Sequence, residues 1–99
     1  MKFTTGANAN MTSLQGYVQA HYHQLVEVFG EPEGGGDKTT VEWCLSFEDG
    51  TVATIYDWKM YETPMGNYNW HVGGMSKLAV ERVQQEVRRF YSSAYGLPA

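Results

Sequence analysis

Cysteine is almost absent from this 99-residue chain, since Cys44 is the only one. A single cysteine cannot form an internal disulfide, so burial and hydrogen bonds must hold the fold together. The chain also lacks a run of about 18 apolar residues, the length that a membrane-spanning helix needs. Its first residues lead into polar ones and not into the apolar segment of a secretory signal. These absences predict a cytoplasmic protein with no membrane role.

Basic residues are scarce: seven Lys and Arg stand against eleven Asp and Glu, for a net charge of −4. Residues 1–74 hold nine acids and three bases, whereas residues 75–99 hold two acids and four bases. An acidic body repels a phosphate backbone, which disfavours direct binding of duplex nucleic acid and favours a basic partner. The length leaves room for one core only, so we expect a single domain over residues 1–99.

Metal-binding and phosphate-binding patterns are missing. His21 and His23 are two residues apart on a predicted helix and point to different sides, and His71 is distant in the sequence. The glycine run at residues 34–36 leads to Lys38 and Thr39, but it follows a helix and opens a strand, the reverse of a phosphate-binding loop. We therefore expect no metal and no cofactor.

A catalytic constellation is missing as well. The strand neighbours of Cys44, which are Glu42 and Ser46, do nothing to lower the pKa of a thiol. No serine stands in a nucleophile motif. The sequence predicts that the protein is not an enzyme, unless Cys44, Asp57 and His71 prove to converge in one pocket.

The first half of the chain predicts a helix at residues 13–29. Apolar residues recur there at steps of three and four, which places them on one helical face: Leu14, Tyr17, Val18, Tyr22, Leu25, Val28 and Phe29. Gly30 and Pro32 end this helix. Residues 1–11 show no period and predict a flexible N-terminal arm.

The middle of the chain predicts three strands. From Thr39 the period becomes two, and the Asp49-Gly50 pair is a strong hairpin signal that turns the chain back through residues 52–58. Residues 59–66 contain Pro64 and form a longer turn before a third strand at residues 68–72. Ser76 caps a last helix, which Gly96 and Pro98 end.

The resulting fold class is α+β. The expected order is helix, three-stranded antiparallel β-meander and helix (αβββα), with both helices packed on one face of the sheet.

Acidic and aromatic residues are the candidates for partner binding. If the acids share one surface, they make an anionic patch for a nucleic-acid-binding groove. Exposed Trp and Tyr are common at binding hot spots, although Trp43 and Trp70 also suit a cross-strand core pair and Trp58 and Tyr61 suit either role. The candidate partner-binding set is Glu31, Glu33, Asp37, Glu48, Asp49, Asp57, Trp58, Tyr61 and Glu62.

Several short motifs resemble a family of small proteins encoded in phages and prophages. They are Phe29-Gly30-Glu31-Pro32, Asp37-Lys38, Glu42-Trp43, Phe47-Glu48-Asp49-Gly50-Thr51, Thr54-Ile55-Tyr56-Asp57-Trp58-Lys59 and Trp70-His71-Val72-Gly73-Gly74. Small acidic phage proteins of this kind are similar to inhibitors of host defence such as anti-CRISPR proteins. The resemblance implies binding to a host defence protein or nuclease complex and supplies no catalytic residues.

Two hypotheses follow. In the first, the protein is a non-enzymatic counter-defence protein that binds and blocks a host immune effector. In the second, it is an oligomeric sponge for a small nucleotide signal, with Trp58 and Trp70 stacking on the base and Arg82, Arg88 and Arg89 meeting the phosphates. A homodimer is compatible with either hypothesis, because a two-fold pairing covers leftover apolar surface.

Overall fold

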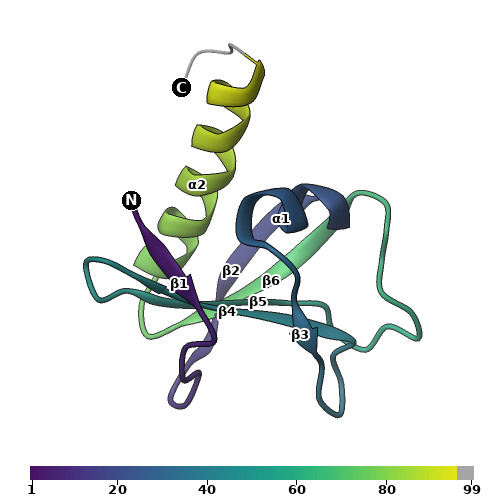
Figure 1. The fold of residues 1–99 in the computed structure, drawn as a ribbon. Helices are drawn as coiled ribbons and strands as arrows, with labels where there is room; N and C mark the ends of the chain where they lie inside the picture. Colours follow the sequence, from purple (N-terminus) through teal and green to yellow (C-terminus); the bar gives the residue numbers. More distant parts are fainter. Residues whose placement is uncertain (96–99) are drawn as a thin grey trace.

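The computed structural model describes residues 1–95 and shows an antiparallel sheet with two helices (Figure 1). The strands are β1 (Phe3–Thr5), β2 (Ser13–Ala20), β3 (Glu33–Gly34), β4 (Val41–Phe47), β5 (Val52–Tyr56) and β6 (Tyr68–Gly74), and the helices are α1 (Tyr22–Phe29) and α2 (Leu78–Tyr95). The sheet order is β1-β4-β5-β6-β2, and β3 also pairs with β4. The class is α+β, but the predicted three-stranded αβββα meander is wrong because the sheet has six strands.

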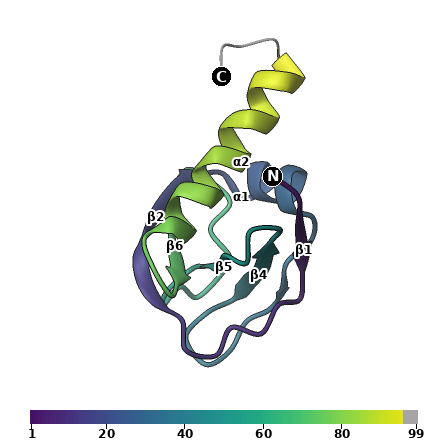
Figure 2. The ribbon, with the colours of Figure 1, turned by 90° about the vertical axis from the view of Figure 1, so that its left-hand side faces the viewer.

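The two helices lie on the same face of the curled sheet (Figure 2). Helix α2 contacts β2, β5 and β6 and also touches α1. The other face of the sheet carries no helix (Figures 1 and 2). No helix among residues 1–95 has the length and apolar content to cross a membrane.

Strand β2 and helix α1 occupy residues 13–29, for which one helix was predicted. Val18 and Ala20 are buried while Tyr17 and Gln19 are exposed, which is the period of a strand. Gly16 lies so close to Val80 of α2 that a Cβ there would stand 2.9 Å from a valine methyl carbon. Residues 13–20 form a strand and not a helix, because pairing with β6 supplies the backbone hydrogen bonds of β2, whereas Gly16 would weaken a helix.

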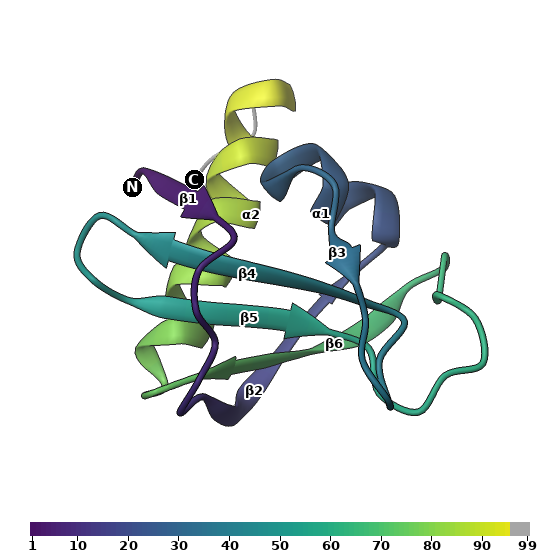
Figure 3. The ribbon, with the colours of Figure 1, turned by 60° about the horizontal axis from the view of Figure 1, so that its bottom comes forward.

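The N-terminal residues, predicted to be a flexible arm, contain β1. Phe3 lies opposite Phe47 of β4, and its ring centroid is 5.3 Å from that of Phe29. After β1 the chain crosses the helix-free face to reach β2 at the other edge of the sheet (Figure 3). We call this crossing segment, residues 6–12, the strap.

Two buried tryptophans hold α1 on the sheet. Trp43 and Trp70 meet edge to face with ring centroids 5.5 Å apart. The Trp70 indole N–H donates to the Ala20 carbonyl (3.0 Å), just before α1, and the Trp43 indole N–H donates to the Gly30 carbonyl (2.7 Å), just after it. The core pair expected for these two residues is therefore present.

Strands β4, β5 and β6 lie where the alternation predicted them. The hairpin turn at Asp49 and Gly50 closes with Phe47 N–H donating to the Thr51 carbonyl (2.8 Å). At the start of α2 the Leu78 N–H donates to Ser76 Oγ (3.3 Å), as expected of a cap. Gly96 and Pro98, predicted to end this helix, lie outside the described residues.

Candidate functional site

A row of five side chains crosses the helix-free face of the sheet. The strand registers place Glu42 opposite Tyr56, Tyr56 opposite His71 and His71 opposite Tyr17. At the other end Glu33 of β3 is opposite Glu42. We call Glu33, Glu42, Tyr56, His71 and Tyr17 the cross-strand row. Directly opposed residues share a face, so the row is one surface built from β3, β4, β5, β6 and β2.

One half of the row is aromatic. The His71 ring lies between those of Tyr56 and Tyr17, with centroid distances of 5.4 and 5.0 Å. Trp58, which follows β5, lies 6.3 Å from both Tyr56 and His71. Tyr17 and Trp58 keep 48% and 43% of their surface exposed. The rings therefore present an accessible aromatic surface.

The other half of the row is acidic. Glu33 and Glu42 are directly opposed, and like charges in this position repel each other. Within the described chain no ion pair or hydrogen bond reaches either carboxylate. The row thus carries two neighbouring negative charges that no basic side chain of residues 1–92 neutralises.

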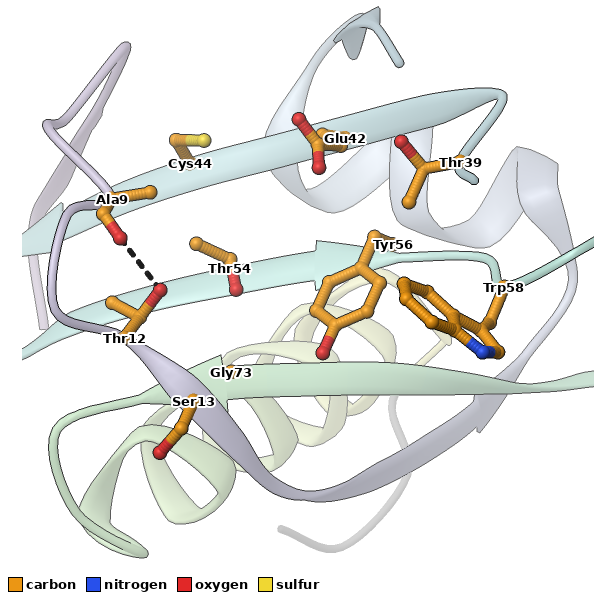
Figure 4. A pocket seen from close by; sticks show the side chains of 10 residues that line it. All are labelled: Ala9, Thr12, Ser13, Thr39, Glu42, Cys44, Thr54, Tyr56, Trp58 and Gly73. Carbon is orange, nitrogen blue, oxygen red and sulfur yellow. Dashed lines mark hydrogen bonds between the residues drawn. The ribbon is translucent and has the colours of Figure 1, made fainter. Parts of the chain in front are cut away.

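A hollow of about 280 Å³ lies beside the row, between the strap and Trp58 (Figure 4). Figure 4 shows the Tyr56 and Trp58 rings next to each other at one end and Thr12 of the strap at the other. The Thr12 hydroxyl donates to the Ala9 carbonyl (2.7 Å), which shapes the strap. The full lining is Ala9, Thr12, Ser13, Thr39, Glu42, Cys44, Thr54, Tyr56, Trp58 and Gly73.

Burial shifts the pKa of His71, Tyr56 and Cys44 on this face in the direction that favours the neutral form. Burial lowers the pKa of His71, against an opposing effect of Asp57. Burial, followed by the charge of Glu42 and by Tyr17, raises the pKa of Tyr56. Burial and then the charges of both glutamates raise the pKa of the Cys44 thiol. A thiol with a raised pKa is a poor nucleophile.

Asp57 does not belong to the surface, contrary to its place among the predicted partner-binding residues. It is fully buried. Its carboxylate accepts hydrogen bonds from the Thr40 N–H and hydroxyl (both 2.7 Å) and from the Val41 N–H (3.4 Å). Thr40 in turn bonds to the Thr63 hydroxyl (2.8 Å). Asp57 therefore ties the β5–β6 loop to the start of β4.

Of Cys44, Asp57 and His71, the three residues on which an enzyme would depend, Cys44 alone lines the hollow. No hydrogen bond among residues 1–92 joins any two of them. Cys44 lies opposite Thr54 and not opposite Tyr56, so it stands outside the cross-strand row. In the same part of the chain no three His, Cys, Asp or Glu side chains gather closely enough to hold a metal ion.

The remaining predicted acids are split between the two ends of the sheet. Glu48 and Asp49 lie at the tip of the β4–β5 hairpin, at the far end of β4 from Glu42 (Figure 3). Asp49 accepts a hydrogen bond from Arg82 Nε (2.9 Å), and Glu48 accepts one from the Lys2 N–H (3.3 Å). Hydrogen bonds from Thr51 and then Arg82 lower the pKa of Asp49 to about 2. The predicted acids therefore do not share a single anionic surface, the condition set for an anionic patch over all of them.

The other end of the sheet keeps most of the predicted partner-binding residues together. Both the segment that leads into β4 and the β5–β6 loop lie there (Figure 3). Exposed predicted residues on these segments and on the approach to β3 are Glu31, Glu33, Asp37, Trp58, Tyr61 and Glu62.

The residues predicted for a nucleotide sponge do not come together. Trp70 is buried on the helix side of the sheet, whereas Trp58 contacts His71 on the helix-free face. Arg82, Arg88 and Arg89 lie on α2, which packs on the opposite face from Trp58. Arg82 is bound by Asp49 and Gln85, and Arg89 Nη1 is 3.6 Å from Glu86. These residues therefore do not form one site within a single copy of the chain.

Sequence reasoning missed four members of the row: Glu42, Tyr56, His71 and Tyr17. The alternation of β4 and β6 already placed Glu42 and His71 on the face away from the core. Tyr17 was hidden by the wrong helix over residues 13–29. Comparisons with protein-family models, curated proteins and solved structures found no match.

Proposed function

We propose that this protein is a non-enzymatic binding protein whose helix-free face holds arginine side chains of a basic protein partner. The observation that carries the proposal is the meeting of two unneutralised carboxylates with exposed aromatic rings on one face. Glu42, Tyr56 and Trp58 all line the same hollow, and Glu33 is opposite Glu42. A guanidinium group is suited to both halves, because it pairs with carboxylates and stacks on aromatic faces.

The open position of the hollow supports a side chain as its occupant. Small-molecule pockets usually enclose most of their ligand. This hollow, at about 280 Å³, lies across an open sheet face. The indole also accepts a cation in its present setting, since Lys38 Nζ lies 6.0 Å from the centroid of the Trp58 ring. An arginine from a larger partner would add a second cation beside Tyr56.

The β5–β6 loop extends this surface. Tyr61 is fully exposed, and Met60 and Met65 are 40% and 52% exposed. Tyrosine supplies contact area at hot spots, and methionine adapts to irregular surfaces. The loop therefore offers apolar contacts around a central aromatic and acidic site, which is the usual anatomy of a protein interface.

A nuclease or another nucleic-acid-binding effector is the partner class that fits best. Such proteins expose arginine to bind phosphates, and an acidic partner competes for the same side chains. The resemblance to small phage proteins supports the setting: inhibition of a host defence complex in the host cytoplasm. The proposal rests on binding alone and assigns no reaction.

A plaque assay tests the proposal. Bacterial strains that each carry one CRISPR nuclease are infected with a targeted phage, with and without this protein. Protection of the phage is expected in at least one strain. Trp58→Ser or Glu42→Gln should weaken the complex with the nuclease of that strain by about tenfold or more, since roughly 1.4 kcal/mol corresponds to a factor of ten, and should therefore reduce protection. Met75→Ser is the control, because Met75 is exposed but lies at the far end of β6. Protection in no strain, or equal protection by all variants, would contradict the proposal.

A further inference from the structure

Strand β2 leaves one edge of the sheet open. It is eight residues long and is the last strand in the sheet order. Within the described chain its backbone forms backbone hydrogen bonds only with β6. The opposite edge differs, because the short strands β1 and β3 both cover β4 there. An open strand edge is a template for pairing with another strand.

Charged side chains and proline, two usual protections of such an edge, are missing from β2. Natural edge strands carry lysine, other charges or proline that prevent pairing. Residues 3–26 contain no Asp, Glu, Lys, Arg or Pro, although the chain as a whole has a net charge of −4. A second copy can therefore approach β2 without like-charge repulsion. Exposed apolar surface accompanies the edge, since Leu14 and Tyr17 are 47% and 48% exposed.

Two features define the part of β2 that is ready to pair. A bulge interrupts the register with β6 between Leu14 and Gly16, so the regular stretch begins at Gly16. At the edge itself, the exposed side chain of Gln84 donates to the Tyr17 carbonyl (3.2 Å). The Gln84 side chain thus occupies the place at the Tyr17 carbonyl that the backbone N–H of a neighbouring strand would take. Such an exposed side chain moves aside at small cost.

We infer that β2 pairs antiparallel with β2 of a second copy of this chain. Two identical antiparallel strands satisfy two-fold symmetry, so the interface is closed and stops at a dimer. The two sheets become one, and their helix-free faces lie on the same side. Tyr17 ends the cross-strand row of each copy, so the two rows meet at the new strand pair. The dimer presents two acidic and aromatic hollows on one continuous surface.

Sedimentation or light scattering of the full chain over a range of concentrations tests this inference. The wild-type protein should be a dimer. Gln19→Lys should make it monomeric, because Gln19 is exposed on β2 and the two lysines repel each other across the two-fold axis. Asn69→Lys is the matched control: Asn69 lies opposite Gln19 on β6, is exposed and is one strand inside the edge. It should leave the dimer intact.

Three results would overturn the inference. The first is a monomeric wild-type protein. The second is a Gln19→Lys variant that remains dimeric and is folded, as judged by near-ultraviolet circular dichroism. The third is equal loss of the dimer in both lysine variants, which would place the interface on the sheet face. The Trp58→Ser variant should remain dimeric, since Trp58 lies beyond β5 and away from β2. Failure of arginine binding is thereby distinguished from failure of the dimer.

Discussion

Glu33 and Glu42 lie directly opposite each other on β3 and β4, and no basic side chain of the described chain bonds to either carboxylate. A like-charge pair at opposed positions of two strands lowers the stability of a sheet. The pair is understandable if a cation from a partner comes to lie between the carboxylates. Sites that break a local rule of stability are often functional ones.

The first prediction concerns this pair. Glu42→Gln should raise the free energy of unfolding by a few tenths of a kcal/mol, up to about 1 kcal/mol, because it removes the repulsion from Glu33. The same variant should bind arginine less well. Urea unfolding measures the first effect, and Glu27→Gln, on the exposed side of α1, is the control. A destabilised Glu42→Gln variant would show that the glutamate pair is structural.

The second prediction concerns the buried carboxylate of Asp57. Asp57→Ala should lower the free energy of unfolding by on the order of 3 kcal/mol, because it leaves the Thr40 and Val41 donors without their acceptor. Asp37→Ala, in the exposed segment before Thr40, should change it little. Equal urea midpoints for the two variants would contradict a structural role of Asp57.

The third prediction concerns the contact between β6 and α2. A Cβ at Gly74 would overlap the Cβ of Ala79. Gly74→Ala should therefore destabilise the protein by about 1–3 kcal/mol, as overpacking of a core does. Gly34→Ala is the control, because a Cβ there meets nothing within 4 Å. Thermal unfolding of both variants checks the prediction, and an unchanged melting temperature for Gly74→Ala would contradict the close packing of α2.

The fourth prediction concerns pH and His71, whose folded-state pKa is below the ordinary value of 6.5 because of burial. The unfolded state then binds the proton more readily than the folded state. The stability linked to His71 is present above pH 6.5 and falls as the pH drops through 6.5 toward the folded-state pKa. His71→Gln should lack this fall when urea midpoints are measured above and below pH 6.5, the ordinary pKa of histidine. An identical pH dependence in both proteins would contradict a neutral His71.

Asp49 does not interfere with this test. Its pKa is lowered to about 2 from 3.8, so its contribution is present above 3.8 and is lost only as the pH falls toward 2. The wild-type and His71→Gln proteins share it equally.

The elements that sequence predicted are those with an unambiguous local pattern. The alternation of β4 and β5 and the Asp49-Gly50 turn determine a hairpin without help from distant residues. Residues 13–20 do not determine their own structure in this way, because Leu14, Tyr17 and Val18 fit a helical period while Val18 and Ala20 fit a strand. The choice depends on pairing with β6, about 50 residues away in the sequence. The three residues of β1 are too few to show any period.

The candidate site also contains residues that local sequence predicts and residues that depend on distant strand pairing. Exposed Trp58 and Glu33 were among the predicted binding residues, because residue type and a loop position were sufficient to propose them. The cross-strand row was not predictable, because it depends on the registers of β2 with β6 and of β3 with β4. Asp57 was wrongly predicted to be a surface residue, because its burial depends on the hydrogen bonds from Thr40.

The most direct test of the arginine-binding face is a titration of the ¹⁵N-labelled protein with a short arginine-glycine peptide, followed by the three indole N–H signals in NMR spectra. Arginine binding at the helix-free face should move the Trp58 signal and leave those of Trp43 and Trp70 in place, because the N–H groups of these two donate to the Gly30 and Ala20 carbonyls in the core. A peptide with citrulline in place of arginine should leave all three signals unchanged. A Trp58 signal that does not move with the arginine peptide, or that moves equally with citrulline, would contradict the account.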